Sequence, residues 1–122
     1  MYFCDLAGII SGQADMISTA VTIARIYTME GHDQLNQALD ILRDEELIMG
    51  VTIIRGIAGF GKNREVHTLS LLDLSLELPL IIEFYDEPDK VEKAIQTLKS
   101  RVDFKHIISW PAIAYIDTTA EE

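Results

Sequence analysis

Two segments with helical periodicity lie between segments that alternate apolar and polar residues, and this order constrains the fold more than any other feature. Residues 19–27, TAVTIARIY, alternate like a strand whose two faces differ. Asp33 is a candidate N-cap for a helix that ends before Gly50. The apolar stripe of this helix consists of Leu35, Ala38, Leu39 and Leu42.

The middle of the chain predicts two strands and a further extended segment. Residues 49–57, MGVTIIRGI, are rich in β-branched side chains, which suit a pleated sheet. Residues 68–78, TLSLLDLSLEL, alternate leucine with Ser, Asp and Glu, so we expect an extended segment there. Pro79 then opens a third strand over residues 79–86, PLIIEFYD, at a position that tolerates proline.

A second helix and a last strand complete the pattern. Pro88 suits the first turn of a helix. The apolar stripe of this helix consists of Val91, Ala94, Ile95, Leu98 and Val102. Residues 106–116, HIISWPAIAYI, predict the final strand, in which Pro111 removes a ladder donor and indicates a bulge or an edge position.

The order of elements is therefore β-α-β-β-α-β, an α+β arrangement known as the ferredoxin-like sandwich, with an antiparallel sheet and both helices on one face. The chain of 122 residues fits a single domain. We expect an N-terminal extension over residues 1–17, the domain over residues 18–117 and a C-terminal tail over residues 118–122.

The strands carry more apolar surface than two helices can cover. Ile53 and Ile54 on the second strand, like Ile81 and Ile82 on the third, point to opposite faces of the sheet. Because a large exposed apolar patch is a liability on a monomer, we expect the second face to be buried in a homo-oligomer.

Charge and composition exclude several classes of function. The formal net charge of −10 argues against a nucleic-acid partner or an anionic membrane surface. Cys4 is the only cysteine, so we expect an ordinary reduced thiol. The N-terminal stretch lacks a basic segment and carries Asp5, and the chain has no uncharged run of about 20 residues. We therefore expect a cytoplasmic protein.

Residues 55–68, RGIAGFGKNREVHT, concentrate positive charge after the second strand. Three of the chain's ten Lys and Arg residues lie here, opposed by Glu65 alone, and three glycines can turn backbone amides toward an anion. Such a loop suits phosphate, carboxylate or the acidic segment of a partner. The candidate ligand-binding residues are Arg55, Gly56, Gly59, Gly61, Lys62, Arg64 and His67.

Two other interpretations of this loop compete with anion binding. It fits equally well a solvated hairpin whose glycines serve turn geometry. It also matches most of the P-loop pattern G-x-x-x-x-G-K-[ST] through Gly56, Gly61 and Lys62. We reject a true P-loop because Asn63 replaces the hydroxyl residue that ligates magnesium, and because the following segment is extended rather than helical.

No catalytic or metal-binding motif stands out. We expect His67 to brace the loop or to donate a hydrogen bond to a ligand, because no sequence-near Cys, Ser or acid pair completes a catalytic group. His32, His67 and His106 are too scattered for a metal motif, although an oligomer interface can gather them. Glu83 is either a perturbed acid or a solvated or cation-paired one, and Trp110 suits core or interface packing.

The stretch from Gly50 to Ile95 resembles the uncharacterised PII-like family, which is related to nitrogen-regulatory PII proteins and to the divalent-ion-tolerance protein CutA. The similarity extends from about Thr19 to Ile116. It rests on Arg55-Gly56-Ile57, Gly59-Phe60-Gly61, Val66-His67-Thr68 and the run from Leu78 to Glu83.

This resemblance implies a ferredoxin-like homotrimer that binds an adenine nucleotide or another small anion in clefts between subunits. No cofactor is required, and the protein is expected to be regulatory rather than an enzyme. Residues 57–68 correspond to the signalling T-loop of PII proteins, whose movement reports occupancy to a partner such as a membrane transporter or channel. A CutA-like metal-binding trimer and a structural trimer without an effector are the alternatives.

Two departures from PII proteins narrow what the resemblance implies. The Gly-Asp-Gly-Lys phosphate loop is absent, and residues 102–106, VDFKH, stand near its place, which argues against ATP specificity. Residues 57–78 contain no tyrosine, so the chain has no acceptor there for the uridylylation that some PII proteins undergo.

Overall fold

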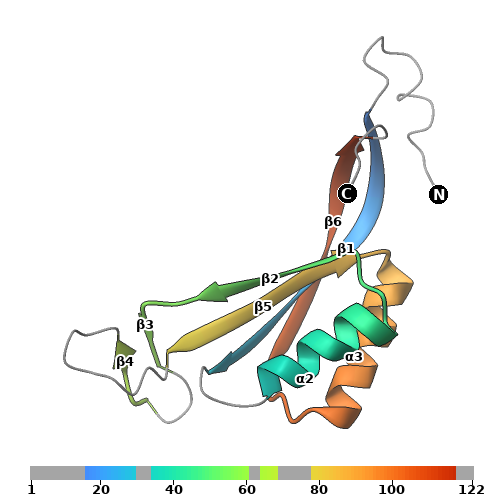
Figure 1. Ribbon diagram of the computed structural model, residues 1–122. Helices are drawn as coiled ribbons and strands as arrows, with labels where there is room; N and C mark the ends of the chain where they lie inside the picture. Colours follow the sequence, from blue (N-terminus) through green and yellow to red (C-terminus); the bar gives the residue numbers. More distant parts are fainter. Residues whose placement is uncertain (1–15, 30–33, 61–63, 69–77, 118–122) are drawn as a thin grey trace.

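The computed structural model describes residues 16–29, 34–60, 64–68 and 78–117 of the chain. Its main element is a four-stranded antiparallel sheet of order β2-β5-β1-β6 (Figure 1). The strands of this sheet are β1 Met16–Met29, β2 Gly50–Arg55, β5 Pro79–Asp86 and β6 Ile107–Asp117. The predicted ferredoxin-like arrangement is thereby confirmed.

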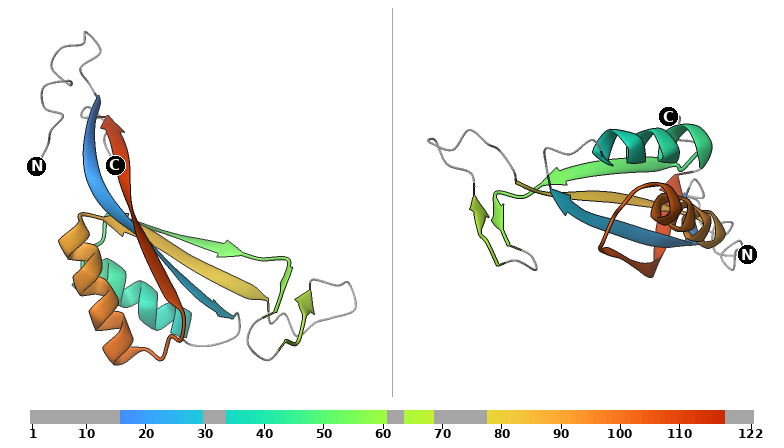
Figure 2. Two further views of the ribbon diagram at one scale, coloured as in Figure 1. Left: turned by 180° about the vertical axis from the view of Figure 1, so that it is seen from behind. Right: turned by 90° about the horizontal axis from the view of Figure 1, so that it is seen from below.

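Both helices lie on one face of the sheet, as predicted (Figures 1 and 2). The first is α2, Gln34–Asp40, which continues as the π-helix η1, Ile41–Glu45, and the second is α3, Pro88–Arg101. The buried core between the helices and the sheet includes Ala24, Ile26, Ala38, Leu42, Ile82, Phe84, Val91, Ala94, Leu98 and Phe104.

The first helix differs from the prediction in one respect. Its apolar stripe is buried at Ala38 and Leu42, but the last turn is a π-helix rather than an α-helix. Leu47 closes this segment with φ of 53°, the left-handed conformation that commonly ends a helix. The helix therefore ends before Gly50, as expected, whereas Asp33, its predicted cap, lies outside the described residues.

The second helix follows its prediction closely. Pro88 occupies its first turn, and Val91, Ala94 and Leu98 are fully buried against the sheet. Burying three such side chains stabilises the domain by several kcal/mol, on the order of 1–3 kcal/mol for each of the larger two.

The last strand shows whether Pro111 marks a bulge or an edge position, the two alternatives that the sequence left open. The pairing of β1 with β6 runs without interruption from Met16 opposite Asp117 to Ile26 opposite Ile107, with Pro111 opposite Thr22. Since β6 is the outermost strand of the sheet, Pro111 marks an edge and not a bulge.

The ends of β1 and β6 extend beyond the rest of the sheet as a two-stranded arm (Figure 1). Strand β5 pairs with β1 only from Thr22 onward, so residues 16–21 pair with residues 112–117 alone. Residues 1–15 and 118–122 lie outside the described residues, as does most of the segment predicted to be extended, residues 69–77. The division at residues 17 and 117 stays a prediction.

Candidate functional site

The cationic stretch of the sequence forms a small hairpin beyond the end of β2 (Figure 1). Two short strands, β3 Ala58–Gly59 and β4 His67–Thr68, form an antiparallel pair. Ala58 lies opposite Thr68, and Gly59 lies opposite His67. The described part of this stretch is therefore paired as a hairpin at its base, rather than irregular.

Two of the three glycines pack against Pro79, the first residue of β5. The Gly56 N–H donates to the Pro79 carbonyl at 2.8 Å. A Cβ atom at Gly56 would lie 3.3 Å from Pro79 Cγ, and one at Gly59 would lie 3.0 Å from the same atom. Close approach to Pro79 therefore gives both positions a packing reason to be glycine, while Gly61 lies outside the described residues.

Two of the three predicted cations are placed by the structure. Arg55 ends β2 and is exposed at the base of the hairpin. Arg64 has φ of 65°, and its guanidinium carbon lies 5.4 Å from the centre of the Phe60 ring, within cation–π range. The structure places the backbone of His67 in β4, whereas Lys62 lies outside the described residues.

Exposed apolar side chains accompany these cations, and they were not among the residues predicted to bind a ligand. Ile57, Phe60 and Val66 are 73%, 57% and 62% exposed, respectively. Three large exposed apolar side chains are not expected of a hairpin that is purely solvated, because exposed apolar patches commonly mark contact sites. Their position among the glycines and cations of residues 55–68 was the feature of the sequence that could have indicated this contact surface.

A cavity of about 320 Å³ lies at the same end of the sheet as the hairpin. The register shows this, because Arg55 lies opposite Leu80 and Leu80 lies opposite Thr28, one of the lining residues. The cavity is lined by Tyr27, Thr28, Met29, Gln34, Asp103, Phe104 and Lys105.

Residues 103–105 form one wall of this cavity. Gln34 Nε2 donates to the Asp103 carbonyl at 2.8 Å, and the Tyr27 N–H donates to the His106 carbonyl at 3.0 Å. Lys105 Nζ lies 3.3 Å from Asp103 Oδ1. The charge of Lys105 is therefore partly balanced by its neighbour, and this wall is less cationic than its sequence suggests.

A second cavity, of about 350 Å³, lies between β6 and the start of α3. Asp89, Glu92 and Trp110 are among its lining residues. Two carboxylates make this cavity a poor site for an anion, since like charges repel.

Within residues 16–29, 34–60, 64–68 and 78–117, no three His, Cys, Asp or Glu residues are grouped so as to hold a metal ion. His106 instead packs against Tyr27, with ring centres 5.5 Å apart. No helix among these residues is both long and apolar enough to cross a membrane.

The fold is that of a ferredoxin-like α+β domain, and it is similar to the folds of PII-like and CutA proteins. CPII from Thiomonas intermedia K12, a PII-like protein bound to ADP, AMP and bicarbonate, superposes with a TM-score of 0.59 at 14% identity, over 82% of this chain and 91% of that one. CutA from Synechococcus elongatus PCC7942 gives a TM-score of 0.59 at 11% identity, over 92% and 90%. At such identities the similarity establishes the fold alone.

The chain belongs to the DUF190 family, described as Uncharacterized ACR, COG1993, whose model matches residues 21–113. Two UPF0166 proteins of Aquifex aeolicus (strain VF5) are 33% and 39% identical to it, over 57 and 59 residues. These matches cover 47% and 48% of this chain and span 54% and 59% of the relatives' lengths, a little over half. The resemblance to an uncharacterised PII-like family is thus confirmed.

Proposed function

We propose that this chain is a PII-like sensor that binds an adenine nucleotide or a similar small anion at clefts between the subunits of a homotrimer. It reports occupancy through the hairpin of residues 57–68. The observation that carries this proposal is the cationic hairpin itself, which stands at the end of the sheet in a chain of formal net charge −10. Anions are attracted to such a local field and repelled from most of the remaining surface.

The candidate residues take different roles in this proposal. Arg55, Lys62 and Arg64 contact the negative charge, and Arg64 can do so with its planar fork while it stacks on Phe60. Gly59 and Gly61 let the backbone approach the ligand, and His67 donates a hydrogen bond or braces the hairpin. The Gly56 amide is already engaged by Pro79, so Gly56 positions the hairpin instead.

We infer assembly because the monomer contains a two-stranded ribbon that no third strand of the described residues supports and because this ribbon carries exposed apolar side chains. A two-stranded ribbon is only marginally stable in water, yet residues 16–21 and 112–117 form one. Met16, Ile113 and Tyr115 on this arm are exposed. A neighbouring subunit that covers the arm would remove this apolar surface from water.

The fold neighbours support a nucleotide as the effector and signalling as the role. CPII has been solved with ADP, AMP and bicarbonate, which are all anions. For this chain, the exposed apolar residues Ile57, Phe60 and Val66 supply a surface for a protein partner, such as a membrane transporter or channel. The protein acts in the cytoplasm as a binding protein without catalysis, and it does not bind nucleic acid.

A thermal-stability screen tests the proposal. The unfolding temperature is measured with AMP, ADP, ATP, cyclic nucleotides, bicarbonate and divalent metals, because a ligand that prefers the folded state raises it. The Lys62→Ala/Arg64→Ala variant is compared with Arg43→Ala/Lys99→Ala, which removes the same charge from the helical side. We expect a nucleotide shift in the parent and the control, but a much smaller one in the hairpin variant.

The same screen separates the alternatives. An equal shift in both variants would show that the two hairpin cations are not phosphate contacts. Stabilisation by a divalent metal that a chelator reverses would favour a CutA-like metal-binding trimer. Response to no ligand would favour a structural trimer.

A further inference from the structure

The face of the sheet opposite the helices, called the open face here, carries a consistent pattern in the strand register. Its side chains form three rows that cross the sheet, since residues directly opposite each other on neighbouring strands point to the same face. The first row is Gly50, Tyr85, Ile23 and Trp110. The second row is Thr52, Glu83, Arg25 and Ile108. The third row is Ile54, Ile81 and Tyr27.

The open face is apolar except at its centre. Ile54, Tyr27, Ile108 and Trp110 are each between 36% and 40% exposed. Among the described helices, both cover the other face (Figures 1 and 2). The expectation that apolar side chains would lie on both faces of the sheet therefore holds for this surface.

An ion pair occupies the centre of the middle row. Arg25 Nε donates to Glu83 Oε1 at 2.7 Å, across the neighbouring strands β1 and β5. The Arg25 guanidinium carbon lies 5.8 Å from the centre of the Trp110 ring. The two charged side chains are 33% and 29% exposed, so each has already lost most of its water. Glu83 is therefore a cation-paired acid, one of the alternatives for this residue, and Trp110 is not a core residue.

The charge of this face indicates what can cover it. Arg25 and Glu83 are the only charged residues in the three rows, and they neutralise each other. Two copies of a chain with formal net charge −10 repel each other over most of their surface, but not here. An apolar, electrically balanced surface with an internally satisfied ion pair can meet a second copy of itself without leaving a buried charge unpaired.

We propose that copies of this chain associate through their open faces, and that the Arg25–Glu83 ion pair determines the specificity of this interface. The Trp110 ring lies against the Arg25 guanidinium in this arrangement. This inference rests on the proposed assembly and names the residues that decide it. On association the pair becomes fully desolvated, so each charge depends on its partner. Loss of either charge therefore weakens the assembly more than loss of both.

The test uses the full chain and measures the mass of the assembly that it forms, by light scattering and sedimentation over a dilution series. Arg25→Ala and Glu83→Ala should each raise the dissociation constant by about 100-fold or more, because each leaves one buried charge without a partner. Arg25→Leu/Glu83→Leu should return to within about tenfold of the parent. Arg43→Ala, which removes an ion-paired arginine from the helical side, should leave the constant unchanged.

Conservative variants keep the test decisive if alanine prevents folding. Arg25→Lys retains the charge but loses the planar fork, and Glu83→Gln retains the shape but loses the charge; both should weaken association while the far-ultraviolet circular dichroism stays that of the parent. Folded single variants with the parent's dissociation constant would overturn this inference alone. A parent that is monomeric at every concentration would overturn both the inference and the proposed clefts between subunits.

Discussion

Pro79 explains why the hairpin contains glycine at two positions that look like a ligand cradle in the sequence. Its ring lies against the backbone at Gly56 and Gly59, and its carbonyl accepts the Gly56 N–H. The three residues thus fix where the hairpin leaves the sheet. Anion binding and packing are therefore compatible explanations, because these contacts with Pro79 engage Gly56 and Gly59 and not the side chains of Arg55 and Arg64.

We predict that Gly59→Ala loosens the hairpin, while Gly50→Ala does not. The new methyl at Gly59 would meet Pro79 Cγ at 3.0 Å, whereas Gly50 has nothing within 4 Å. Overpacking of this kind costs roughly 1 kcal/mol, which corresponds to about fivefold faster amide exchange at residues 58, 59, 67 and 68. Hydrogen exchange followed by NMR measures this, and equal protection in the two variants would show that Pro79 does not constrain Gly59.

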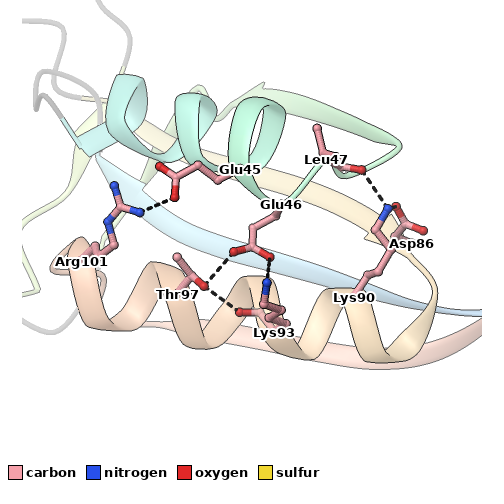
Figure 3. Close-up of polar contacts among 8 residues, drawn as sticks. All are labelled: Glu45, Glu46, Leu47, Asp86, Lys90, Lys93, Thr97 and Arg101. Atoms are coloured by element: carbon pink, nitrogen blue, oxygen red, sulfur yellow. Dashed lines mark hydrogen bonds and ion pairs between the residues drawn. The ribbon is translucent and has the colours of Figure 1, made fainter.

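Asp86 carries a buried carboxylate, and 3% of the residue's surface is exposed. Its Oδ2 accepts the Met49 N–H at 2.9 Å, and its Oδ1 accepts the Glu87 N–H at 2.7 Å. Lys90 Nζ lies 3.3 Å away from Oδ2 (Figure 3). One side chain therefore joins the start of β2 to the start of α3.

Replacement of Asp86 should be one of the most destabilising single changes in the chain. Asp86→Ala leaves two backbone donors without their acceptor and Lys90 without its partner, so we expect a loss of about 3 kcal/mol. Asp103→Ala is the control, because its side chain is 74% exposed and its pair with Lys105 should contribute less than about 1 kcal/mol. Urea denaturation measures both, and similar losses would contradict the role assigned to Asp86.

At the scale of elements, the two helices are joined by polar contacts along one line (Figure 3). Arg101 pairs with Glu45 at the end of η1, and Thr97 Oγ1 donates to Glu46 at 2.8 Å. Lys90 Nζ donates to the Leu47 carbonyl at 2.9 Å. Helix α3 therefore contacts the end of the π-helical turn and the two residues that follow it, Glu46 and Leu47.

This contact line predicts a specific pH dependence. The hydrogen bond from Arg101 lowers the pKa of Glu45, so this carboxylate stabilises the fold above the ordinary glutamate pKa of about 4.3. Its contribution is lost as the pH falls through the lowered pKa of the folded state. Arg101→Gln should return the Glu45 pKa to its ordinary range, as followed by carboxyl NMR, and an unchanged titration would show that Arg101 is not the cause.

Local periodicity explains how much of the fold could be predicted from the sequence. The alternation through Ile82 and Phe84 and the stripe through Val91, Ala94 and Leu98 are written in neighbouring residues, and the structure buries these side chains. The π-helical turn at Ile41–Glu45 could not be predicted, because its apolar residues also fit an α-helix. The same limit applies to the extended arm, whose partner strand lies far along the chain.

The candidate site was less accessible to sequence reasoning because its geometry depends on distant residues. The cluster of cations was visible, but the contact of Gly59 with Pro79 and the pairing of Arg25 with Glu83 join residues on different strands. The exposed side chains of Ile57, Phe60 and Val66 were overlooked because apolar residues in a strand-rich sequence are first assigned to the core.

On the scale of the whole molecule, the two ends of the sheet differ in their proposed roles, which are ligand binding at the hairpin and subunit contact at the arm. The cationic hairpin extends from one end and the two-stranded arm from the other (Figure 2). The open face, with Arg25 and Glu83 at its centre, lies between them. Association through this face would hold several hairpins in fixed positions, so that a ligand bound beside one subunit changes a surface offered to a partner.

Direct titration of ADP into the assembled protein, followed by calorimetry, tests the central claim that the cationic hairpin holds an anionic effector. The account predicts saturable binding of about one nucleotide per subunit, weakened at least tenfold in Lys62→Ala/Arg64→Ala and unchanged in Arg43→Ala/Lys99→Ala. Absence of binding, or equal affinity in the two double variants, would contradict it.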